Sequence, residues 1–533
     1  MSRIGIIGGG ITGLSACHFV RKLIPSAQVT LFERAPACGG WLRSKQIPIS
    51  ATNPALTIPI ELGPNSIRGG NDPRCLVTAQ LISDLHLSDS IVAPSESAKK
   101  RFIYSEHKLH SMEQMAIRCL LTSMLWVPWY QLFYYLKGGH ALRRHDESIE
   151  SFFRRNFGSK LTHNLATSFV NGVYGGGIGH LSISSCSPFN QIKQIENEYG
   201  SYFVGGIIKM LSRRKNVEQI EAEGSPPAVD LSKFPSFTFR GGLQQITNAL
   251  VHRLEGDDHV HLHRSLEVES MRYLKESESV ELGGNGSRFA FDYVLNAVEP
   301  RQSTAFLDSD TDLAAFNLSA SMVTVNVVFR GSAFAESIKG KFEGFGVLIP
   351  DDDRSMLGII YYSSVFPPMS FAADCAADSD LEEGEPVLSL VMMFGGTRFD
   401  VHSQTAAEIV SLCKLKLKSL YDVDVELENG TEVICDGEDP VDATVTGYDV
   451  LYNINRLNHA VDHYLVGHLE KMESLREHVD AAYHGKVSLI GSGYDGVGIP
   501  DCILSAYNAA KGIADRMGEL DTAQTTHSLA NHA

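Results

Sequence analysis

The chain begins with a short apolar run, a helical pattern and a second apolar run. Residues 3–8 read R-I-G-I-I-G, and a continuous apolar run that ends in glycines is typical of a buried parallel strand. Residues 10–21 predict a helix with small residues at its start, and residues 28–33 (Q-V-T-L-F-E) predict a second strand. Together they predict a β-α-β unit of about 30 residues.

Near the C-terminus the chain again passes from a strand into a helix. Residues 486–490 predict the strand, residues 491–503 (G-S-G-Y-D-G-V-G-I-P-D-C-I) a glycine-rich turn, and the following residues a helix to about position 517. Glycines in this turn would let a helix N-terminus approach a planar ligand, and a plain β-α turn is the alternative.

The middle of the chain predicts further elements and several breaks. Alternating apolar positions predict strands, a 3.6-residue period predicts an amphipathic helix, and Pro-rich or acidic stretches predict linkers. We expect strands at 322–330 and 386–394, a helix at 404–420, linkers at 221–236 and 371–386, and a disordered tail from about 520.

Residues 112–139 differ from the rest of the chain. Residues 119–136 carry no charge, are rich in tryptophan and tyrosine, contain Pro128, and are bracketed by Arg118 and Lys137. A run of about 18 residues is at the lower limit for a membrane span. Because such aromatics prefer the membrane interface, we favour insertion into a membrane surface over a buried helical hairpin or a true span.

Composition excludes some classes of protein and hides this local stretch. The 533 residues are 43% hydrophobic and 20% charged, which excludes global disorder and fibrous repeats. The net charge of −17 argues against a nucleic-acid partner. Nine widely spaced cysteines without a C-x-x-C pair favour a reducing compartment over a disulfide framework or a zinc site. We expect no signal peptide, because a strand begins almost at Met1.

A dinucleotide-binding motif occupies the first β-α-β unit. Gly8-x-Gly10-x-x-Gly13 follows the first strand and opens the helix, and Glu33 ends the second strand. Gly8 would make the tight turn, Gly10 would let the backbone approach a pyrophosphate, and Gly13 would pack the helix on the strand. Glu33 would accept hydrogen bonds from ribose hydroxyls. An ordinary tight turn is the weaker interpretation.

Beyond this motif, the order and spacing of short stretches resemble the oxygen-dependent protoporphyrinogen oxidase family, of the eukaryotic mitochondrial type, within the flavin-containing amine oxidase superfamily. The resemblance runs from about residue 3 to residue 516. The stretches that carry it are R-A-P-A-C-G-G-W-L-R-S at 34–44, E-L-G-P-N-S-I-R at 61–68, K-R-F-I-Y at 100–104, N-G-V-Y-G-G-G at 171–177, R-G-G-L-Q at 240–244, G-F-G-V-L-I-P at 344–350, Y-L-V-G-H at 464–468 and Y-D-G-V-G-I-P-D-C at 494–502.

The resemblance implies an α/β fold with an α+β substrate domain. A Rossmann-like FAD-binding domain would consist of 1–85, 236–300 and 484–520, a helical membrane-binding domain with part of the substrate site would span 90–230, and a substrate-binding domain would span 301–483, followed by a disordered tail at 521–533. No second dinucleotide motif follows the glycines at 175–179, so a nicotinamide site is not expected.

The resemblance also implies an activity and partners. The family oxidises a porphyrinogen in haem biosynthesis, uses non-covalent FAD, and passes electrons to molecular oxygen to make hydrogen peroxide. It implies a place on the mitochondrial inner membrane, a homodimer and a contact with ferrochelatase.

Site residues carry over one position at a time. Arg101 matches an arginine that pairs with a propionate, and a surface arginine beside Lys99 and Lys100 is the alternative. Four apolar residues match positions that sandwich the macrocycle, for which ordinary strand core is the alternative: Phe345, Leu348, Ile360 and Met393. Asn65 and Gly177 match positions near the flavin and the reacting ring. The expected FAD contacts are Gly8, Gly10, Ile11, Thr12, Gly13, Glu33, Arg34, Gly40, Trp41, Gly63, Pro64, Asn65, Leu266, Gly491, Val497, Gly498 and Ile499.

Some functional questions stay open at this point. No His, Asp or Glu stands out as a catalytic base, and the histidines at 259, 261 and 263 do not predict a metal site. The family usually has I-P-Q-Y where this chain has Val461-Asp462-His463-Tyr464, which leaves the substrate open between protoporphyrinogen and coproporphyrinogen. An amine oxidase and a catalytically silent flavoprotein that carries a tetrapyrrole are the remaining alternatives.

Overall fold

The computed structural model describes residues 1–48, 57–115, 117, 146–202, 205–206, 208, 229–304, 306–307, 318–329, 333–350, 353, 355–367, 387–425, 431–435 and 450–518. The uncharged stretch 119–136, the linker 371–386, residues 221–228 of the other linker and the tail from 520 lie outside these residues. In the parts described, no helix combines the length and the apolar character that crossing a membrane requires.

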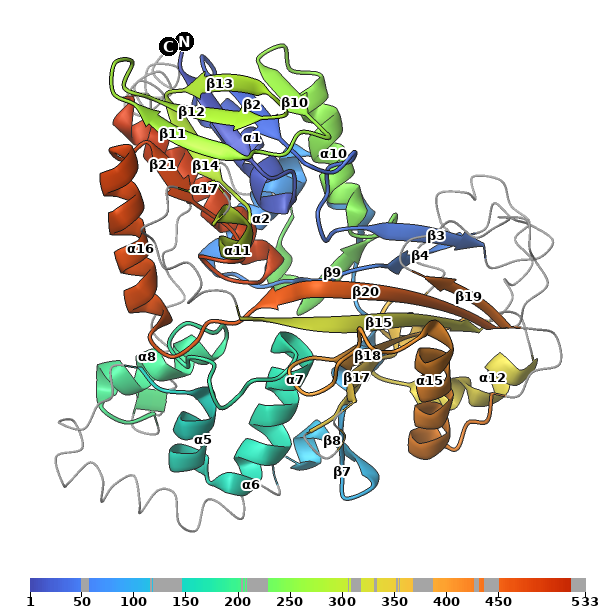
Figure 1. Cartoon of the computed structure of the whole chain (residues 1–533). Coiled ribbons are helices and arrows are strands. Elements are labelled where there is room, and N and C mark those ends of the chain that lie inside the picture. Colours follow the sequence, from blue (N-terminus) through green and yellow to red (C-terminus); the bar gives the residue numbers. More distant parts are fainter. Residues whose placement is uncertain are drawn as a thin grey trace, which may run out of the picture.

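A five-stranded parallel sheet forms the upper body of the molecule, which we call the parallel-sheet unit (Figure 1). Its strand order is β10 (Val260–His263), β2 (Gln28–Phe32), β1 (Arg3–Ile7), β14 (Tyr293–Asn296) and β21 (Val487–Leu489). The predicted strands at 3–8, 28–33 and 486–490 are therefore confirmed. Three separated parts of the chain contribute to this one sheet, so its core combines N-terminal, central and C-terminal segments.

Each face of this sheet is covered by a different set of elements. On one face, apolar side chains pack against α1 (Ile11–Leu23), α2 (Pro73–Asp84), α10 (Gln244–Glu255) and α17 (Ile499–Arg516). The other face packs against α16 (His468–Tyr483) and an antiparallel sheet of β11 (Ser270–Leu274), β12 (Ser279–Gly284) and β13 (Ser287–Phe291). Because α16 packs here, residues 468–483 lie with the parallel-sheet unit, although the predicted substrate domain includes them.

An eight-stranded sheet lies below the parallel-sheet unit, with its two longest strands across the middle of the molecule (Figure 1). Its order is β19 (Thr431–Cys435), β20 (Val450–Asp462), β15 (Ser319–Phe329), β18 (Leu388–Gly395), β17 (Met356–Ile360), β16 (Gly346–Leu348), β7 (Arg101–Ser105) and β8 (Lys108–Ser111). The predicted strands at 322–330 and 386–394 are confirmed. Residues 101–111, which the prediction gives to the helical domain, add the last two strands through the pairing of β7 with β16.

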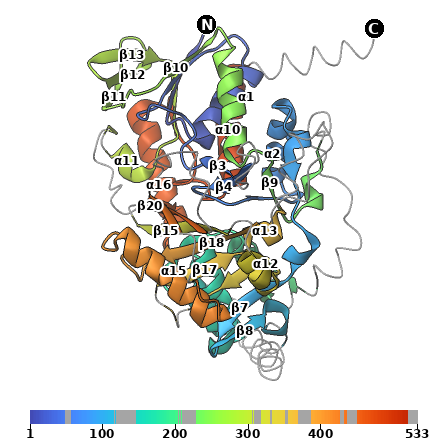
Figure 2. The same cartoon turned by 90° about the vertical axis from the view of Figure 1, so that its right-hand side faces the viewer.

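The outer face of the eight-stranded sheet carries two helices. Figure 2 shows α15 (Ala406–Tyr421) and α12 (Ala333–Lys339) against it. The predicted helix at 404–420 is thus confirmed. It begins with a capping box, in which Thr405 accepts from the backbone N–H of Glu408 and the Glu408 carboxylate accepts from the backbone N–H of Thr405.

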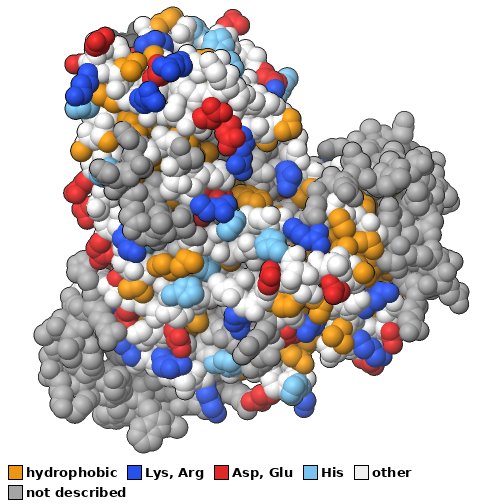
Figure 3. Space-filling model, in the orientation of Figure 1, with side chains coloured by type: hydrophobic (Ala, Val, Ile, Leu, Met, Phe, Trp, Pro, Cys, Tyr) orange, Lys and Arg blue, Asp and Glu red, His pale blue; other side chains and the backbone are white. Residues whose placement is uncertain are grey.

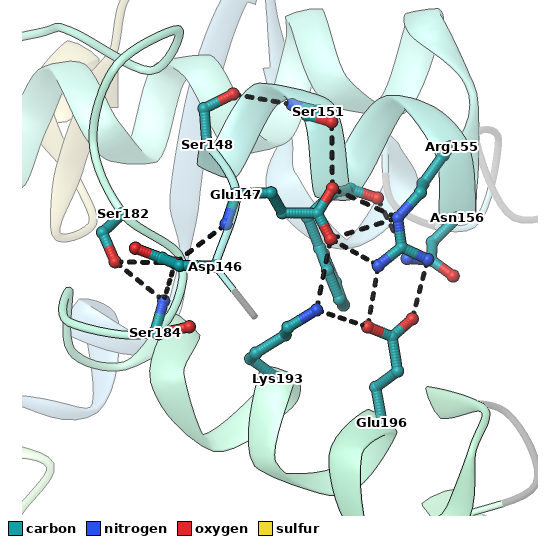
Figure 4. A network of polar contacts seen from close by, with 11 residues as sticks. Asp146, Glu147, Ser148, Ser151, Arg155, Asn156, Ser182, Ser184, Lys193 and Glu196 are labelled. Atoms are coloured by element: carbon teal, nitrogen blue, oxygen red, sulfur yellow. Dashed lines mark hydrogen bonds and ion pairs between the residues drawn. The ribbon is translucent and has the colours of Figure 1, made fainter. Parts of the chain in front are cut away.

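Residues 146–202 form a helical unit on the lower side of the molecule (Figure 1). It contains α5 (Ile149–Phe157), α6 (Ser159–Leu161), a π-helical turn (Thr162–Thr167), α7 (Ser168–Tyr174) and α8 (Phe189–Tyr199). Figure 4 shows a buried ionic network between α5 and α8, in which Arg155 and Lys193 both contact the carboxylates of Glu147 and Glu196.

Short elements join these units. They are β3 (Ser44–Pro48), β4 (Thr57–Glu61), β5 (Ile67–Arg68), β6 (Ile91–Val92), β9 (Ser236–Phe239), α11 (Pro300–Ser303), α13 (Tyr362–Val365), and 3₁₀ turns at Ser88–Ser90, Glu96–Lys99, Leu231–Lys233 and Gly340–Phe342. Over the face that Figure 3 shows, acidic and basic side chains are interspersed across the upper part.

Candidate functional site

The turn between β1 and α1 requires glycine at two of its positions. Gly8 has a φ of +100°, a conformation that other residues rarely adopt. A Cβ on Gly13 would lie 1.9 Å from the carbonyl oxygen of Gly8, whereas a Cβ on Gly10 would meet only the Cα of Gly40, at 4.0 Å. The loop is therefore closed beneath Gly13 and open at Gly10, as a backbone that approaches a pyrophosphate needs to be.

The first turn of α1 can receive a phosphate. The helix starts after Gly10, and its first backbone N–H groups have no intrahelical acceptor. Because the helix has no side-chain cap and no acidic residue in its first turn, these groups are available to a phosphate. Glu33 lies beside this turn, where Oε2 accepts from the N–H of Gly9 at 2.7 Å and Oε1 accepts from that of Ala35 at 2.7 Å. These bonds fix the carboxylate at the end of β2, where the motif places a ribose.

A second glycine pair packs directly on this loop. The N–H of Gly39 donates to the carbonyl of Gly9 at 2.8 Å, and a Cβ on Gly40 would lie 3.1 Å from the Cα of Gly10. A Cβ on Gly63 would lie 2.2 Å from the carbonyl oxygen of Trp41. The structure therefore brings together expected FAD contacts from three stretches of the chain.

The C-terminal segment closes against the same loop. Gly491 has a φ of +103°, and a Cβ there would lie 2.9 Å from Oγ1 of Thr12. Gly498 is the N-cap of α17, but its N–H donates to the Asp501 carboxylate at 3.2 Å, and Arg74 pairs with Asp501 at 2.9 Å. One donor of this helix terminus is thus already used within the protein.

The remaining expected contacts lie around this centre. Leu266 donates its N–H to the carbonyl of Glu33 at 3.0 Å, Arg34 is exposed next to it, Ile499 is buried against the helices, and Val497 packs against the helical unit. Pro64 and Asn65 follow Gly63, and the buried Oδ1 of Asn65 has no hydrogen-bond partner among the described residues. An open glycine loop, a free helix terminus and an orphaned amide oxygen fit a dinucleotide. When bound, FAD would supply the two-electron acceptor.

Four of the seven expected substrate residues share one face of the eight-stranded sheet, which we call the inner face: Arg101, Leu348, Ile360 and Met393. Residues directly opposite one another in a ladder point to the same side. The register therefore gives two adjacent rows on this face. The first row is Ile103, Leu348, Gly358, Met393, Thr324 and Asn455, and the second row is Arg101, Gly346, Ile360, Val391, Asn326 and Asn453.

β4 and α7 each cover part of the inner face, but they do not bury it completely. Asn326 donates from Nδ2 to the carbonyl of Glu61 in β4 at 2.9 Å, and a Cβ on Gly172 of α7 would lie 2.5 Å from Cδ2 of Leu348. Even so, Leu348, Ile360 and Met393 are only half-buried. Large apolar side chains that stay partly accessible beside covering elements offer a surface that an apolar ring can contact.

Arg101 stands at the edge of this face. Its guanidinium Cζ lies 4.9 Å from the ring centroid of Phe345, and Phe345, Ile360 and Met393 pack against the same apolar cluster. The four apolar residues and the arginine of the prediction are therefore neighbours in space, a combination that matches a ring bearing carboxylates.

The sequence prediction missed four polar side chains on the inner face. Thr324 and Asn326 alternate with valines in β15, and Asn453 and Asn455 alternate with apolar residues in β20. This alternation is typical of a strand with one face in water, yet all four side chains are at most 4% exposed. The sequence shows these polar residues at alternate positions of β15 and β20. Only the tertiary structure shows that the polar side of both strands faces the interior.

The segment Val461-Asp462-His463-Tyr464 connects all three units. Asp462 accepts from the hydroxyl of Ser492 at 3.2 Å, Tyr464 donates to the carbonyl of Ser492, and His463 donates from Nε2 to the carbonyl of Tyr174 at 2.7 Å. Ser492 belongs to the glycine-rich C-terminal segment, and Tyr174 ends α7. The departure from the family pattern therefore lies where the sheet, the helical unit and the C-terminal segment meet.

Ionisable groups gather at this junction, although none stood out in the sequence. A Cβ on Gly177 would lie 2.6 Å from Nε2 of His180 and 3.1 Å from Cε1 of His463, and burial lowers the pKa of both histidines. Burial raises the pKa of Asp462 to about 6. Burial and the Asp462 carboxylate raise the pKa of Glu299 to about 7.

Comparisons with known proteins agree with this geometry. The family model described as Flavin containing amine oxidoreductase matches residues 23–514. The protoporphyrinogen oxidase of Schizosaccharomyces pombe is 26% identical over 96% of this chain and 99% of its own length. The coproporphyrinogen III oxidase of Staphylococcus aureus is 24% identical over 95% of this chain and 98% of its own length. A crystal structure from Exiguobacterium sp. 255-15, provisionally named a protoporphyrinogen oxidase, matches with a TM-score of 0.69 at 20% identity, covering 97% of this chain and 99% of that one.

Proposed function

Because the chain belongs to the Flavin containing amine oxidoreductase family and is an FAD-dependent oxidoreductase, we propose that it oxidises protoporphyrinogen IX to protoporphyrin IX. The observation that carries this proposal is the inner face of the eight-stranded sheet. Arg101 stands at its edge, and Leu348, Ile360 and Met393 form a half-buried apolar surface beside it. A ring with propionates on one side and apolar substituents on the other matches this arrangement.

The reaction proceeds in repeated two-electron steps. Over the whole oxidation six hydrogens leave the ring, four from the bridging carbons and two from pyrrole nitrogens, because a porphyrin keeps two N–H groups. FAD held at the glycine loop of Gly8, Gly10 and Gly13 would supply the two-electron acceptor for each step, and molecular oxygen would be the final acceptor, reduced to hydrogen peroxide. The protein's contribution is to place the ring and exclude water.

We also propose a place at the inner mitochondrial membrane, as a peripheral protein that forms a homodimer and contacts ferrochelatase. The uncharged aromatic stretch 119–136 between Arg118 and Lys137 supports the membrane contact, and the family resemblance supports the rest. Vesicle flotation of the full chain, compared with a variant that carries two aspartates in this stretch, tests the membrane contact.

One assay tests the function and separates the two porphyrinogens. The holoenzyme is mixed anaerobically with protoporphyrinogen IX or coproporphyrinogen III, and flavin bleaching is followed; air is then admitted, and porphyrin fluorescence and peroxide are measured. We expect faster bleaching with protoporphyrinogen and one peroxide for each two electrons removed. Faster bleaching with coproporphyrinogen would move the chain to the activity named for the Staphylococcus relative. No bleaching with either porphyrinogen would contradict the proposal and identify the chain as a flavoprotein without this activity.

A further inference from the structure

Two buried polar atoms on the inner face have no partner within the described part of the chain. They are Oγ1 of Thr324 and Nδ2 of Asn453. Thr324 is 2% exposed and Asn453 is fully buried, so neither side chain reaches bulk solvent. Burying a polar group without a hydrogen bond is destabilising, and valine or leucine would fill the same space without that cost. The fold alone gives no reason for these residues.

Thr324 lies beside one of the residues expected to hold the ring, and Asn453 lies diagonally across the ladder from Thr324. Thr324 pairs directly with Met393 across the ladder, and Asn453 lies one row along and one strand further, opposite Asn326. Directly paired residues have Cβ atoms about 5 Å apart and diagonal ones about 7–8 Å apart, so one planar ring can reach both side chains.

The orientation of Asn453 is set by its neighbour. Asn455 donates from Nδ2 to Oδ1 of Asn453 at 2.9 Å. Because Oδ1 of Asn453 accepts this bond, its Nδ2 group is the part of the amide that can donate to a ligand. Asn326 contributes in another way, because its own Nδ2 donates to the carbonyl of Glu61 at 2.9 Å and so ties the sheet to β4, one of the short elements that join it to the parallel-sheet unit. The polar rows therefore lie where the sheet meets the unit that carries the dinucleotide loop.

We propose that Thr324 and Asn453 hydrogen-bond a planar ring ligand held between the inner face and the parallel-sheet unit. The ligand presents an acceptor to Nδ2 of Asn453 and a donor or acceptor to Oγ1 of Thr324. Two rings share this chemistry. One is the flavin, whose pyrimidine edge carries carbonyl acceptors and an N–H donor; the other is the tetrapyrrole, with pyrrole N–H donors and carboxylate acceptors, and that second source rests on the proposed function.

The test uses variants that change one atom type while keeping the shape. Thr324→Val removes the hydroxyl, Thr324→Ser keeps it, and Asn453→Leu removes the amide. Thr162→Val is the matched control, because Thr162 is also buried but its hydroxyl donates to the carbonyl of Gly158 at 2.8 Å in the helical unit. Two affinities are measured on each full-length holoenzyme: that for FAD, from flavin fluorescence released on dilution, and that for protoporphyrin IX, from quenching of porphyrin fluorescence.

We expect Thr324→Val and Asn453→Leu each to weaken one affinity by roughly 2- to 12-fold, the range that one net hydrogen bond gives. Thr324→Ser should restore it. A loss in FAD affinity identifies the flavin as the ligand, and a loss confined to the porphyrin identifies the tetrapyrrole. Thr162→Val should lower the melting temperature and change neither affinity.

If Thr324→Val and Asn453→Leu leave both affinities at the wild-type values, the proposal is wrong whatever happens to the melting temperature. This outcome is separate from a failure of the proposed function. If porphyrinogens do not bleach the wild-type enzyme, the FAD affinities of the variants still test whether Thr324 and Asn453 bind the flavin.

Discussion

The guanidinium of Arg101 lies over the ring of Phe345, with Cζ 4.9 Å from the ring centroid. This contact holds a long cationic side chain at the end of the second row of the inner face, where the apolar surface begins. A carboxylate that approaches the edge of that surface would meet a cation already in position.

Replacing this arginine should therefore weaken substrate binding far more than it affects stability. Arg101→Met is expected to raise KM for protoporphyrinogen by roughly 10- to 100-fold, the range for a hydrogen bond to a charged group, with a smaller change in kcat. Arg101→Lys should recover part of the loss, because it keeps the charge but not the planar fork.

Lys100→Met is the matched control for this experiment. Lys100 is the adjacent cation, exposed and 3.6 Å from Glu343. Steady-state kinetics on the three variants test this prediction. Equal effects of Arg101→Met and Lys100→Met would contradict a specific role of Arg101 and would indicate a general attraction of the basic surface for an anionic substrate.

Gly13 should be irreplaceable for cofactor binding. In Gly13→Ala, the new Cβ would lie 1.9 Å from the carbonyl oxygen of Gly8, so the loop that approaches the pyrophosphate must move. We expect less than about a tenth of the wild-type FAD content and a lower melting temperature. Gly512→Ala in α17 is the control, because a Cβ there meets nothing within 4 Å and should raise stability by about 0.5–1 kcal/mol.

Flavin absorbance per mole of purified chain measures the first effect, and urea unfolding measures the second. A Gly13→Ala protein with full FAD content would show that this close packing is not needed for the site.

Sequence patterns were sufficient wherever neighbours in the chain determine the structure. The strand at 3–8, the glycines at 8, 10 and 13, and the helix capped by Thr405 all follow from local periodicity and spacing. Arg101, Leu348, Ile360 and Met393 were named only through family resemblance, and their common face becomes visible only with the register of strands that are far apart in sequence.

What could not be predicted depends on contacts between distant segments. Thr324 and Asn453 alternate with apolar residues as solvent-facing side chains do, and only the cover provided by other units buries them. Asp462 and Glu299 are 163 positions apart, and nothing local to either indicates that their carboxylates interact.

The ionic network of the helical unit should dominate the stability of that unit. Lys193 is 2% exposed and contacts Glu147 at 3.2 Å and Glu196 at 2.8 Å. Lys193→Met leaves Arg155 as the one counter-charge that the described residues provide for these two buried carboxylates, so we expect the free energy of unfolding to fall by about 3–5 kcal/mol. Lys99→Met, at an exposed pair with Glu96, should change it by less than about 0.5 kcal/mol.

This network should also make the protein sensitive to acid. Burial opposes ionisation, but bonds to Arg155 and Lys193 outweigh it and lower the pKa of both Glu147 and Glu196. A carboxyl whose pKa is lower in the folded state contributes stability above the unfolded value of about 4.3 and loses it as the pH falls through the folded value. Urea unfolding between pH 6 and about pH 3 should therefore show a steep loss in the wild type and a shallower one in Glu147→Gln, and parallel curves would contradict this reading of the network.

Asp462 should produce a pH dependence of the opposite sign. Its folded pKa of about 6 lies above the usual value for aspartate, about 3.9, so the folded chain keeps a proton that the unfolded chain has released. The contribution of Asp462 to stability is then greatest below about pH 4 and declines as the pH rises towards 6, by about 2–3 kcal/mol. The groups that act on it are Ser492, Arg301 and Glu299: the first two favour the charged form, and the carboxylate of Glu299 interacts unfavourably with it. Asp462→Asn should remove this part of the decline and leave the part that comes from Glu299, whose pKa burial raises to about 7. Ser492→Ala should extend the decline to higher pH, because the hydroxyl that bonds the carboxylate at 3.2 Å is gone. Urea unfolding of the full-length holoenzyme at half-unit steps from about pH 4 to pH 8 measures all three slopes, and an Asp462→Asn protein that declines as steeply as the wild type would assign the effect to another group.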